Sequence, residues 1–198
     1  LHAEFPDRSE CLALDVTRPV GWKTAVEQIL KKHSRLDVLV NNAGRHEDGL
    51  LATMSLEAWE GVRAANLDAT FHGCQAVLRV MISQRHGRIV NVSSLSALLP
   101  PAGQGNYSAA KAGVVALSQS LAKEVARMNI TVNVVCPGYI DTEALSGMSD
   151  EERKAVSGRI PMRRLGRPAE VAAAVRFLAG DEASYITGAI IKVDGGIF

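Results

Sequence analysis

Short apolar runs rich in Val and Ile alternate along this chain with longer amphipathic stretches. The runs lie near residues 11–15, 36–41, 87–93, 130–136 and 189–193, and the stretches cover 19–33, 55–83, 107–128, 149–157 and 168–179. A strand that is buried on both faces is a continuous apolar run, and strands joined by helices run parallel. The alternation therefore predicts an α/β chain whose parallel sheet is covered by helices on both faces.

The helix boundaries and one irregular segment refine this prediction. Ser149 and Glu152 have the spacing of a capping box, and Pro168 with Glu170 is typical of a helix start. The polar segment at about 142–165 would lie over the strand ends, where it is either a lid or an ordinary surface loop. We predict a Rossmann-like, doubly wound parallel sheet in a single domain over residues 1–198, with this lid-like loop.

Composition excludes several classes of protein. The net charge of +1 gives no electrostatic reason to expect nucleic acid or a membrane as a partner, and no run of apolar residues is long enough to span a bilayer. The cysteines lie in apolar stretches without metal-like spacing, so buried free thiols are favoured over disulfides or ligands. The histidines also lack metal-binding spacing, and we predict no metal. These residues are Cys11, Cys74, Cys136, His2, His33, His46, His72 and His86.

Tyr107 and Lys111 stand four residues apart in GNYSAAKAG, and Ser94 ends the upstream apolar run. On a helix, residues at i and i+4 lie on one face, roughly 5–6 Å apart. An ammonium at that distance favours the phenolate, so Lys111 should lower the pKa of Tyr107 and let it exchange a proton with a substrate oxygen. Ser94 can donate a second hydrogen bond to that oxygen. The pattern predicts carbonyl reduction or alcohol oxidation, although the Tyr–Lys spacing alone also arises by chance.

Three further motifs surround this pair. NNAG, from Asn41 to Gly44, closes one apolar run, where small residues let the backbone approach a ligand closely. Asn66 falls inside a predicted helix, for which Asn is a poor former. PGYIDT, from Pro137 to Thr142, closes another run. A tight turn, a polar surface position and a simple turn are the respective alternatives.

Taken together and in this order, these motifs resemble the short-chain dehydrogenase/reductase family. The resemblance implies that Tyr107 is the general acid, that Lys111 tunes it and binds the nicotinamide ribose, and that Asn66 holds a relay water. The spacing of the family selects Ser94 rather than Ser93 as the substrate donor. The implied cofactor-binding residues are Asp15, Val16, Asn42, Ala43, Gly44, Tyr107, Lys111, Pro137, Gly138, Ile140 and Thr142.

Several longer segments, among them GQGNYSAAKAG and SYITGAIIKVDGG, resemble bacterial 3-oxoacyl-[acyl-carrier-protein] reductases. This implies NADPH-dependent reduction of a carrier-bound 3-oxoacyl group, with NADH not excluded, and a homotetramer. Lys123 and Arg164 would form a basic ridge for the acidic carrier protein. A reductase of another ketone (an acyl-CoA, a sugar, a steroid or an aromatic compound) and a noncatalytic truncated subunit are the alternatives.

No glycine-rich turn of the kind that binds a dinucleotide precedes the strand near 11–15. Compared with the family, the N-terminal βαβ portion is therefore expected to be missing from this chain, together with any targeting segment. The free cysteines indicate a reducing compartment, so we expect a cytoplasmic protein, or a mitochondrial matrix protein if a targeting segment precedes it.

Overall fold

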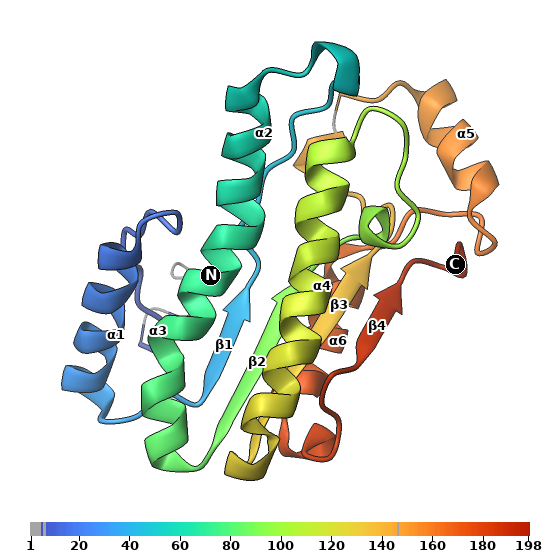
Figure 1. Ribbon diagram of the computed structural model, residues 1–198. Coiled ribbons are helices and arrows are strands. Elements are labelled where there is room, and N and C mark those ends of the chain that lie inside the picture. The colour runs from blue at the N-terminus through green and yellow to red at the C-terminus, as the bar shows by residue number, and fades with distance from the viewer. Residues whose placement is uncertain (1–4, 6, 146) are drawn as a thin grey trace.

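The computed structural model describes residues 5, 7–145 and 147–198, and its centre is a parallel sheet of four strands. The strands β1 (Val38–Asn41), β2 (Gly87–Val92), β3 (Ile130–Pro137) and β4 (Ile190–Val193) lie in the order β1-β2-β3-β4 (Figure 1). Every neighbouring pair is parallel. All strands therefore end at the same edge of the sheet, and the predicted Rossmann-like α/β fold in one domain is confirmed.

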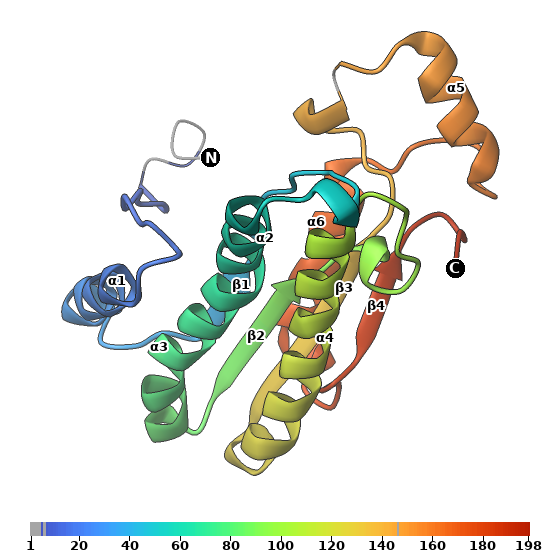
Figure 2. The ribbon, with the colours of Figure 1, turned by 45° about the horizontal axis from the view of Figure 1, so that its top comes forward.

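Helices cover both faces of this sheet. The helices α3 (Ala69–Gln84) and α4 (Gly105–Val125) pack on one face, and α6 (Pro168–Ala179) packs on the other (Figure 1). The helix α1 (Pro19–His33) packs against α3, and α2 (Leu56–Arg63) packs against α4. The helix α5 (Asp150–Arg159) stands apart from the sheet, beyond the carboxyl ends of the strands (Figure 2).

The central strands explain why the core is divided by the sheet. Nearly all residues of β2 and β3 are buried, as expected for strands covered on both sides. Ile89 and Val132 join an apolar cluster with α3 and α4, whereas Val90 and Val135 join a second cluster with α6. This two-sided packing fixes β2, β3 and α4 relative to one another.

The strand predicted at 11–15 is wrong. These residues form no strand, and Cys11, predicted to be buried, is an exposed free thiol. A strand needs a neighbour to satisfy its backbone groups, and within the described residues β1 pairs only with β2. The other two cysteines, Cys74 and Cys136, are buried and free, as predicted.

The long helix predicted at 55–83 is interrupted in its middle. A π-helical segment, Ala64–Asp68, separates α2 from α3, and Asn66 lies at its centre. π-Segments are frequent at functional sites. The capping box of Ser149 and Glu152 and the helix start at Pro168 are confirmed. Among the described residues, no helix is long and apolar enough to cross a membrane.

Candidate active site

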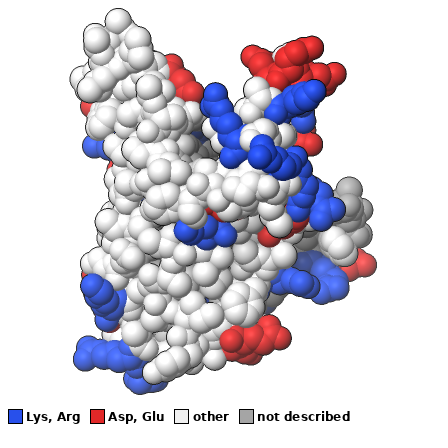
Figure 3. All heavy atoms as spheres, turned by 90° about the vertical axis from the view of Figure 1, so that its right-hand side faces the viewer, with Lys and Arg blue, Asp and Glu red and all other residues white. Residues whose placement is uncertain are grey.

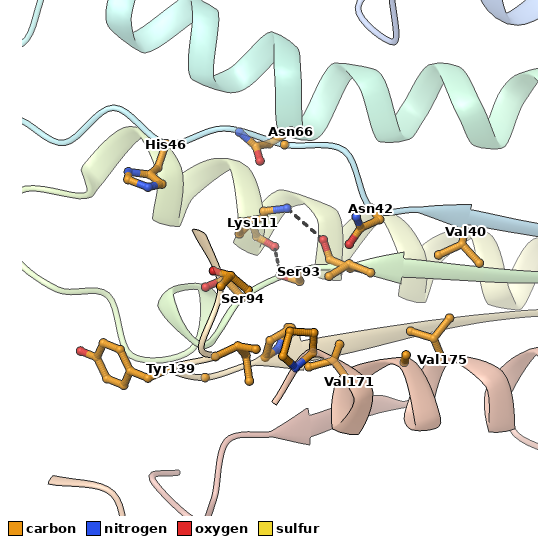
Figure 4. Close-up of a pocket in the computed structure, with 18 of the residues that line it drawn as sticks. Val40, Asn42, His46, Asn66, Ser93, Ser94, Lys111, Tyr139, Val171 and Val175 are labelled. Carbon is orange, nitrogen blue, oxygen red and sulfur yellow. Dashed lines mark hydrogen bonds between the residues drawn. The ribbon is translucent and has the colours of Figure 1, made fainter. Parts of the chain in front are cut away.

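A cavity of about 890 Å³ opens at the carboxyl ends of the strands. Its wall combines the loop after β1, the end of β2, the first turns of α4, the turn after β3 and one side of α6 (Figure 4). The predicted residues Asn66, Ser94, Tyr107 and Lys111 all line it. Segments that are far apart in the sequence thus meet in one place because parallel strands share a carboxyl edge.

Lys111 is held against the end of β2. Its Nζ donates a hydrogen bond to the carbonyl of Val92 at 2.9 Å, and its own carbonyl accepts one from the Ser93 hydroxyl at 2.8 Å (Figure 4). The Nζ lies 5.7 Å from the centre of the Tyr107 ring. The predicted pairing of Tyr107 and Lys111 on one helix face is therefore present.

Burial dominates the acid–base properties of this pair. Lys111 is only 4% exposed, and desolvation lowers its pKa to about 8. Desolvation also raises the pKa of Tyr107, and a hydrogen bond with Ser94 offsets this only in part. The pKa of Tyr107 is thus raised, not lowered as predicted, because the cost of burying a phenolate exceeds the effect of the Ser94 hydrogen bond. At neutral pH the phenol consequently keeps the proton that a reduction requires.

The two neighbouring serines differ in what their hydroxyl groups contact. Ser93 is buried and donates to the carbonyl of Lys111. The Oγ of Ser94 accepts a hydrogen bond from the backbone N–H of Ser96 at 3.1 Å, and Ser94 also hydrogen-bonds Tyr107. A hydroxyl that accepts still has its own proton to donate. Ser94, rather than Ser93, therefore presents a donor to the cavity.

Asn66 is fully buried and only partly satisfied. Its Nδ2 donates to the carbonyls of Arg45 at 2.7 Å and Val62 at 2.8 Å. Its Oδ1 has no hydrogen-bond partner among the described residues, although it lies in the cavity wall. Buried polar atoms normally have a partner, so an orphaned acceptor facing a cavity indicates a place for a donor such as water.

Gly44 brings this acceptor and Lys111 close to the backbone of the loop after β1. A Cβ added at Gly44 would lie 2.4 Å from the Asn66 Oδ1 and 3.4 Å from the Lys111 Nζ. Gly138 is similarly crowded, because a Cβ there would lie 2.9 Å from the Cα of Asp194. Glycine is required at both positions by close packing.

Most residues that the resemblance assigns to a dinucleotide meet in this cavity. Asn42, Gly44, Pro137, Gly138, Ile140 and Thr142 line it together with Tyr107 and Lys111. The volume, the glycine positions and the unsatisfied Asn66 Oδ1 fit the nicotinamide half of such a cofactor.

Asp15, Val16 and Ala43 are not among the cavity-lining residues. The carboxylate of Asp15 accepts hydrogen bonds from the backbone and hydroxyl of Thr17, which lower its pKa, and the carbonyl of Val16 accepts one from Trp22. In this structure Asp15 and Val16 organise a turn before α1. Their assignment to the cofactor remains a prediction.

Lys123 and Arg164 do not form one ridge. Lys123 lies twelve residues beyond Lys111 on α4, about 18 Å farther along the helix at about 1.5 Å per residue. Arg164 is held by both oxygens of Glu170, at 2.7 and 2.8 Å. Basic and acidic side chains are interspersed on the face of the molecule that carries α5 (Figure 3). The ridge predicted from these two residues is therefore wrong as a single surface.

The segment predicted as a lid, at about 142–165, contacts the cavity near its N-terminal end. Leu145 lines the cavity, and Arg153 of α5 bonds Asp141 at 2.9 Å. Backbone hydrogen bonds between residues 139–141 and Gly166 join the two ends of the segment. Ser146 lies outside the described residues, and a lid function remains a prediction.

Four residues near the site carry contacts that the sequence motifs did not reveal. His46 lies at the edge of the Tyr107 ring, with ring centres 6.2 Å apart, and Tyr139 faces the cavity from the other side (Figure 4). Asp48 and Gln104 contact each other beside the site. Ordinary loop composition gave no signal for these contacts, which depend on how two distant loops meet.

No group of three possible metal ligands occurs within residues 5, 7–145 and 147–198. His2, one of the five histidines considered, lies outside these residues.

The site and the fold define a class of enzyme. A family model described as Enoyl-(Acyl carrier protein) reductase matches residues 1–197. The chain belongs to the short-chain dehydrogenase/reductase family, whose members are NAD(P)-dependent oxidoreductases that act on a keto or hydroxyl group.

Individual relatives are similar over nearly all of the chain. It is 44% identical over 192 residues to the 3-oxoacyl-[acyl-carrier-protein] reductase FabG of Vibrio cholerae, covering 97% of this chain and 79% of the relative. The FabG proteins of Escherichia coli and Thermotoga maritima are also each 44% identical, over 94% and 98% of this chain and 77% and 78% of their own lengths.

Gly44 offers a test of the site with a matched control. We expect Gly44→Ala to weaken binding of the nicotinamide cofactor about tenfold or more, because the new methyl group must displace Asn66, whose side chain is held by two hydrogen bonds. Gly49→Ala is the control, since a Cβ there meets nothing within 4 Å. Dissociation constants from cofactor fluorescence measure the effect. Equal affinities of the two variants would contradict the close approach at Gly44.

Proposed function

We propose that this chain reduces a 3-oxoacyl thioester carried on acyl carrier protein to the 3-hydroxyacyl form, with NADPH as the cofactor. The observation that carries the proposal is that the partly buried Tyr107 has Lys111 and the Ser94 hydroxyl beside it in one cavity. The names of the relatives at 44% identity support the substrate and the carrier.

The residues divide the reaction among them. When bound, the nicotinamide supplies a hydride to the carbonyl carbon, and Asn42, Gly44, Lys111 and the turn from Pro137 to Thr142 would hold it. Ser94 donates a hydrogen bond to the carbonyl oxygen and so polarises the C=O bond. Tyr107 transfers its proton to the same oxygen as the hydroxyl forms.

The buried ammonium supports this proton transfer. As Tyr107 loses its proton, negative charge develops on the phenol oxygen in a region that water enters poorly. The positive charge of Lys111, with its Nζ 5.7 Å from the ring centre, stabilises that charge more effectively there than it would in bulk water. Lys111 thus stabilises Tyr107 after it has given up its proton, whereas burial keeps the phenol protonated before the reaction.

Asn66 completes the proton supply. Its unsatisfied Oδ1 can hold a water molecule near Lys111, so that a proton from solvent replaces the one that Tyr107 has given up. The two hydrogen bonds that its Nδ2 donates prevent the amide from turning this oxygen away. This accounts for an unfavourable helix residue at the centre of the π-segment.

Assembly and docking belong to the same proposal. The resemblance to the family supports a homotetramer, and exposed apolar side chains are available for it, such as Phe71 on α3 and Phe177 on α6. Light scattering that gave a stable monomer at micromolar concentration would contradict this assembly.

For the acidic carrier we propose a docking surface at Lys123 and Arg127, which stand together at the end of α4, instead of a ridge that includes Arg164.

Replacing Tyr107 tests the catalytic assignment. We expect Tyr107→Phe to reduce kcat/KM for a 3-oxoacyl thioester at least about a hundredfold, because the proton donor is lost while the ring is kept. Tyr185→Phe removes the same hydroxyl from a fully exposed residue and should leave the rate unchanged. Normal turnover by a folded Tyr107→Phe protein would remove Tyr107 from the mechanism.

Charge reversal tests the carrier surface. We expect Lys123→Glu to lower kcat/KM several-fold for a carrier-bound 3-oxoacyl substrate, and to leave a short free thioester unaffected, because only the acidic carrier is steered by this charge. The difference should shrink as ionic strength rises. Arg164→Glu serves as the comparison, since Arg164 is already paired with Glu170. If both substrates respond equally to Lys123→Glu, the end of α4 is not the docking surface.

A further inference from the structure

A chain of hydrogen bonds leads from the loop after β1 to the proposed substrate donor. The Gln104 Nε2 donates to the Asp48 Oδ2 at 2.9 Å, and the Gln104 Oε1 accepts from the Ser96 hydroxyl at 3.0 Å. The backbone N–H of Ser96 then donates to the Ser94 Oγ at 3.1 Å. Gln104 and Ser96 are both partly buried, and no other protein partner competes for these groups among the hydrogen bonds of the described residues.

The chemistry of each group fixes the direction of each hydrogen bond in this chain. A carboxylate only accepts, so Asp48 must face the NH₂ of Gln104, which turns the amide oxygen toward Ser96. Because that oxygen also only accepts, the Ser96 hydroxyl must donate to it. By holding the Ser96 side chain, Gln104 keeps residue 96 where its backbone N–H, which can only donate, reaches the Ser94 Oγ. The Oγ accepts from that side, and its single proton is left to point elsewhere.

The Ser94 proton can still point into the cavity, where the reaction would take place. Ser94 lines the cavity and hydrogen-bonds Tyr107. A proton directed there meets the oxygen of the phenol or of a bound carbonyl, which is where a substrate donor is needed. A Ser94 hydroxyl that rotated freely would spend part of its time in other directions.

Asp48 is itself held firmly in place. The backbone N–H of Gly49 donates to the carbonyl of Gly103 at 2.8 Å. The side chain of Asn106 donates to the carbonyl of Glu47 at 3.0 Å. Asp48 also contacts His46 at 3.4 Å, and the ring of His46 lies against that of Tyr107. The loop is thereby fastened to the first turn of α4, which carries Tyr107.

We propose that Gln104, oriented by Asp48, is a positioning residue that acts through Ser96 to direct the hydroxyl proton of Ser94 into the active site. This inference rests on the proposed role of Ser94 as the substrate donor. Gln104 is not among the residues that line the cavity, and it acts by limiting the orientations of Ser94, which does line it.

A double-mutant cycle tests the inference. Gln104→Met keeps the length of the side chain but removes both hydrogen bonds. Ser96→Ala removes the hydroxyl that Gln104 holds and leaves the backbone N–H that bonds Ser94 in place. Each is made alone and together with Ser94→Ala, and kcat and KM are measured with a 3-oxoacyl thioester and NADPH. Gln119→Met, at an exposed position of the same helix, is the control. Thermal unfolding of every variant reports whether the fold is kept.

We expect Gln104→Met and Ser96→Ala each to lower kcat about tenfold with little change in the KM for NADPH, because one directed hydrogen bond is lost. In the Ser94→Ala background the same changes should cost less than about twofold, since no hydroxyl remains to be directed. A residue that served only the fold would cost as much in either background.

Three results would overturn the inference. Full additivity with Ser94→Ala would show that Gln104 does not act through Ser94. Unchanged kcat in both Gln104→Met and Ser96→Ala, with Ser94→Ala strongly impaired, would leave the proposed function standing and remove the positioning role. Normal activity of Ser94→Ala would remove the proposed role of Ser94, and with it the inference. If Gln104→Met does not fold, the cycle with Ser96→Ala decides alone.

Discussion

The contact between α4 and the end of β2 holds the site together. Through it Lys111 is bonded at both ends, by its Nζ to the carbonyl of Val92 and by its carbonyl to the hydroxyl of Ser93. Deeper in the same interface, the amide of Asn91 donates to Ser118 of α4 at 2.8 Å. Since these groups are buried, breaking any one leaves an unpaired polar atom, which strongly disfavours sliding or turning of α4.

This fixed helix also sets the electrostatics. An ammonium that is 4% exposed has lost most of its hydration, and its pKa of about 8 reflects that loss. Tyr107 is desolvated in the same place, so its pKa moves upward. Burial therefore pushes the two groups toward their neutral forms, which leaves the phenol as the acid and the ammonium close to losing its charge. Reduction needs that acid. As the phenolate forms during proton transfer, the nearby positive charge of Lys111 stabilises it.

Much of this arrangement could be predicted from the sequence. The four paired strands and the helices after them follow from apolar runs and caps, and the cavity gathers Asn66, Ser94, Tyr107 and Lys111 as the motif order indicated. The strand predicted at 11–15 failed because a strand depends on a neighbour, which local sequence does not supply. The predicted direction of the shift in the Tyr107 pKa was wrong because the spacing to Lys111 is visible in a sequence, whereas burial is not.

What could not be predicted are the contacts between loops. Gln104 and Asp48 are 56 residues apart, and no motif in the sequence indicates that they meet. The supposed ridge of Lys123 and Arg164 shows the opposite error, since two basic residues were grouped without knowing that α4 carries one of them away from the cavity. Short motifs are informative when their members share one helix or one strand end, and much less so when their grouping depends on tertiary structure.

Transfer of a labelled hydride tests the central claim most directly. The protein is mixed with a 3-oxoacyl thioester and NADPH that carries deuterium at the transferable position of nicotinamide C4, and the product is analysed by mass spectrometry. The account predicts one deuterium on the carbon that bears the new hydroxyl group, at a rate that collapses in Tyr107→Phe. A wild-type protein that binds both ligands and yields no deuterated 3-hydroxyacyl product would contradict it.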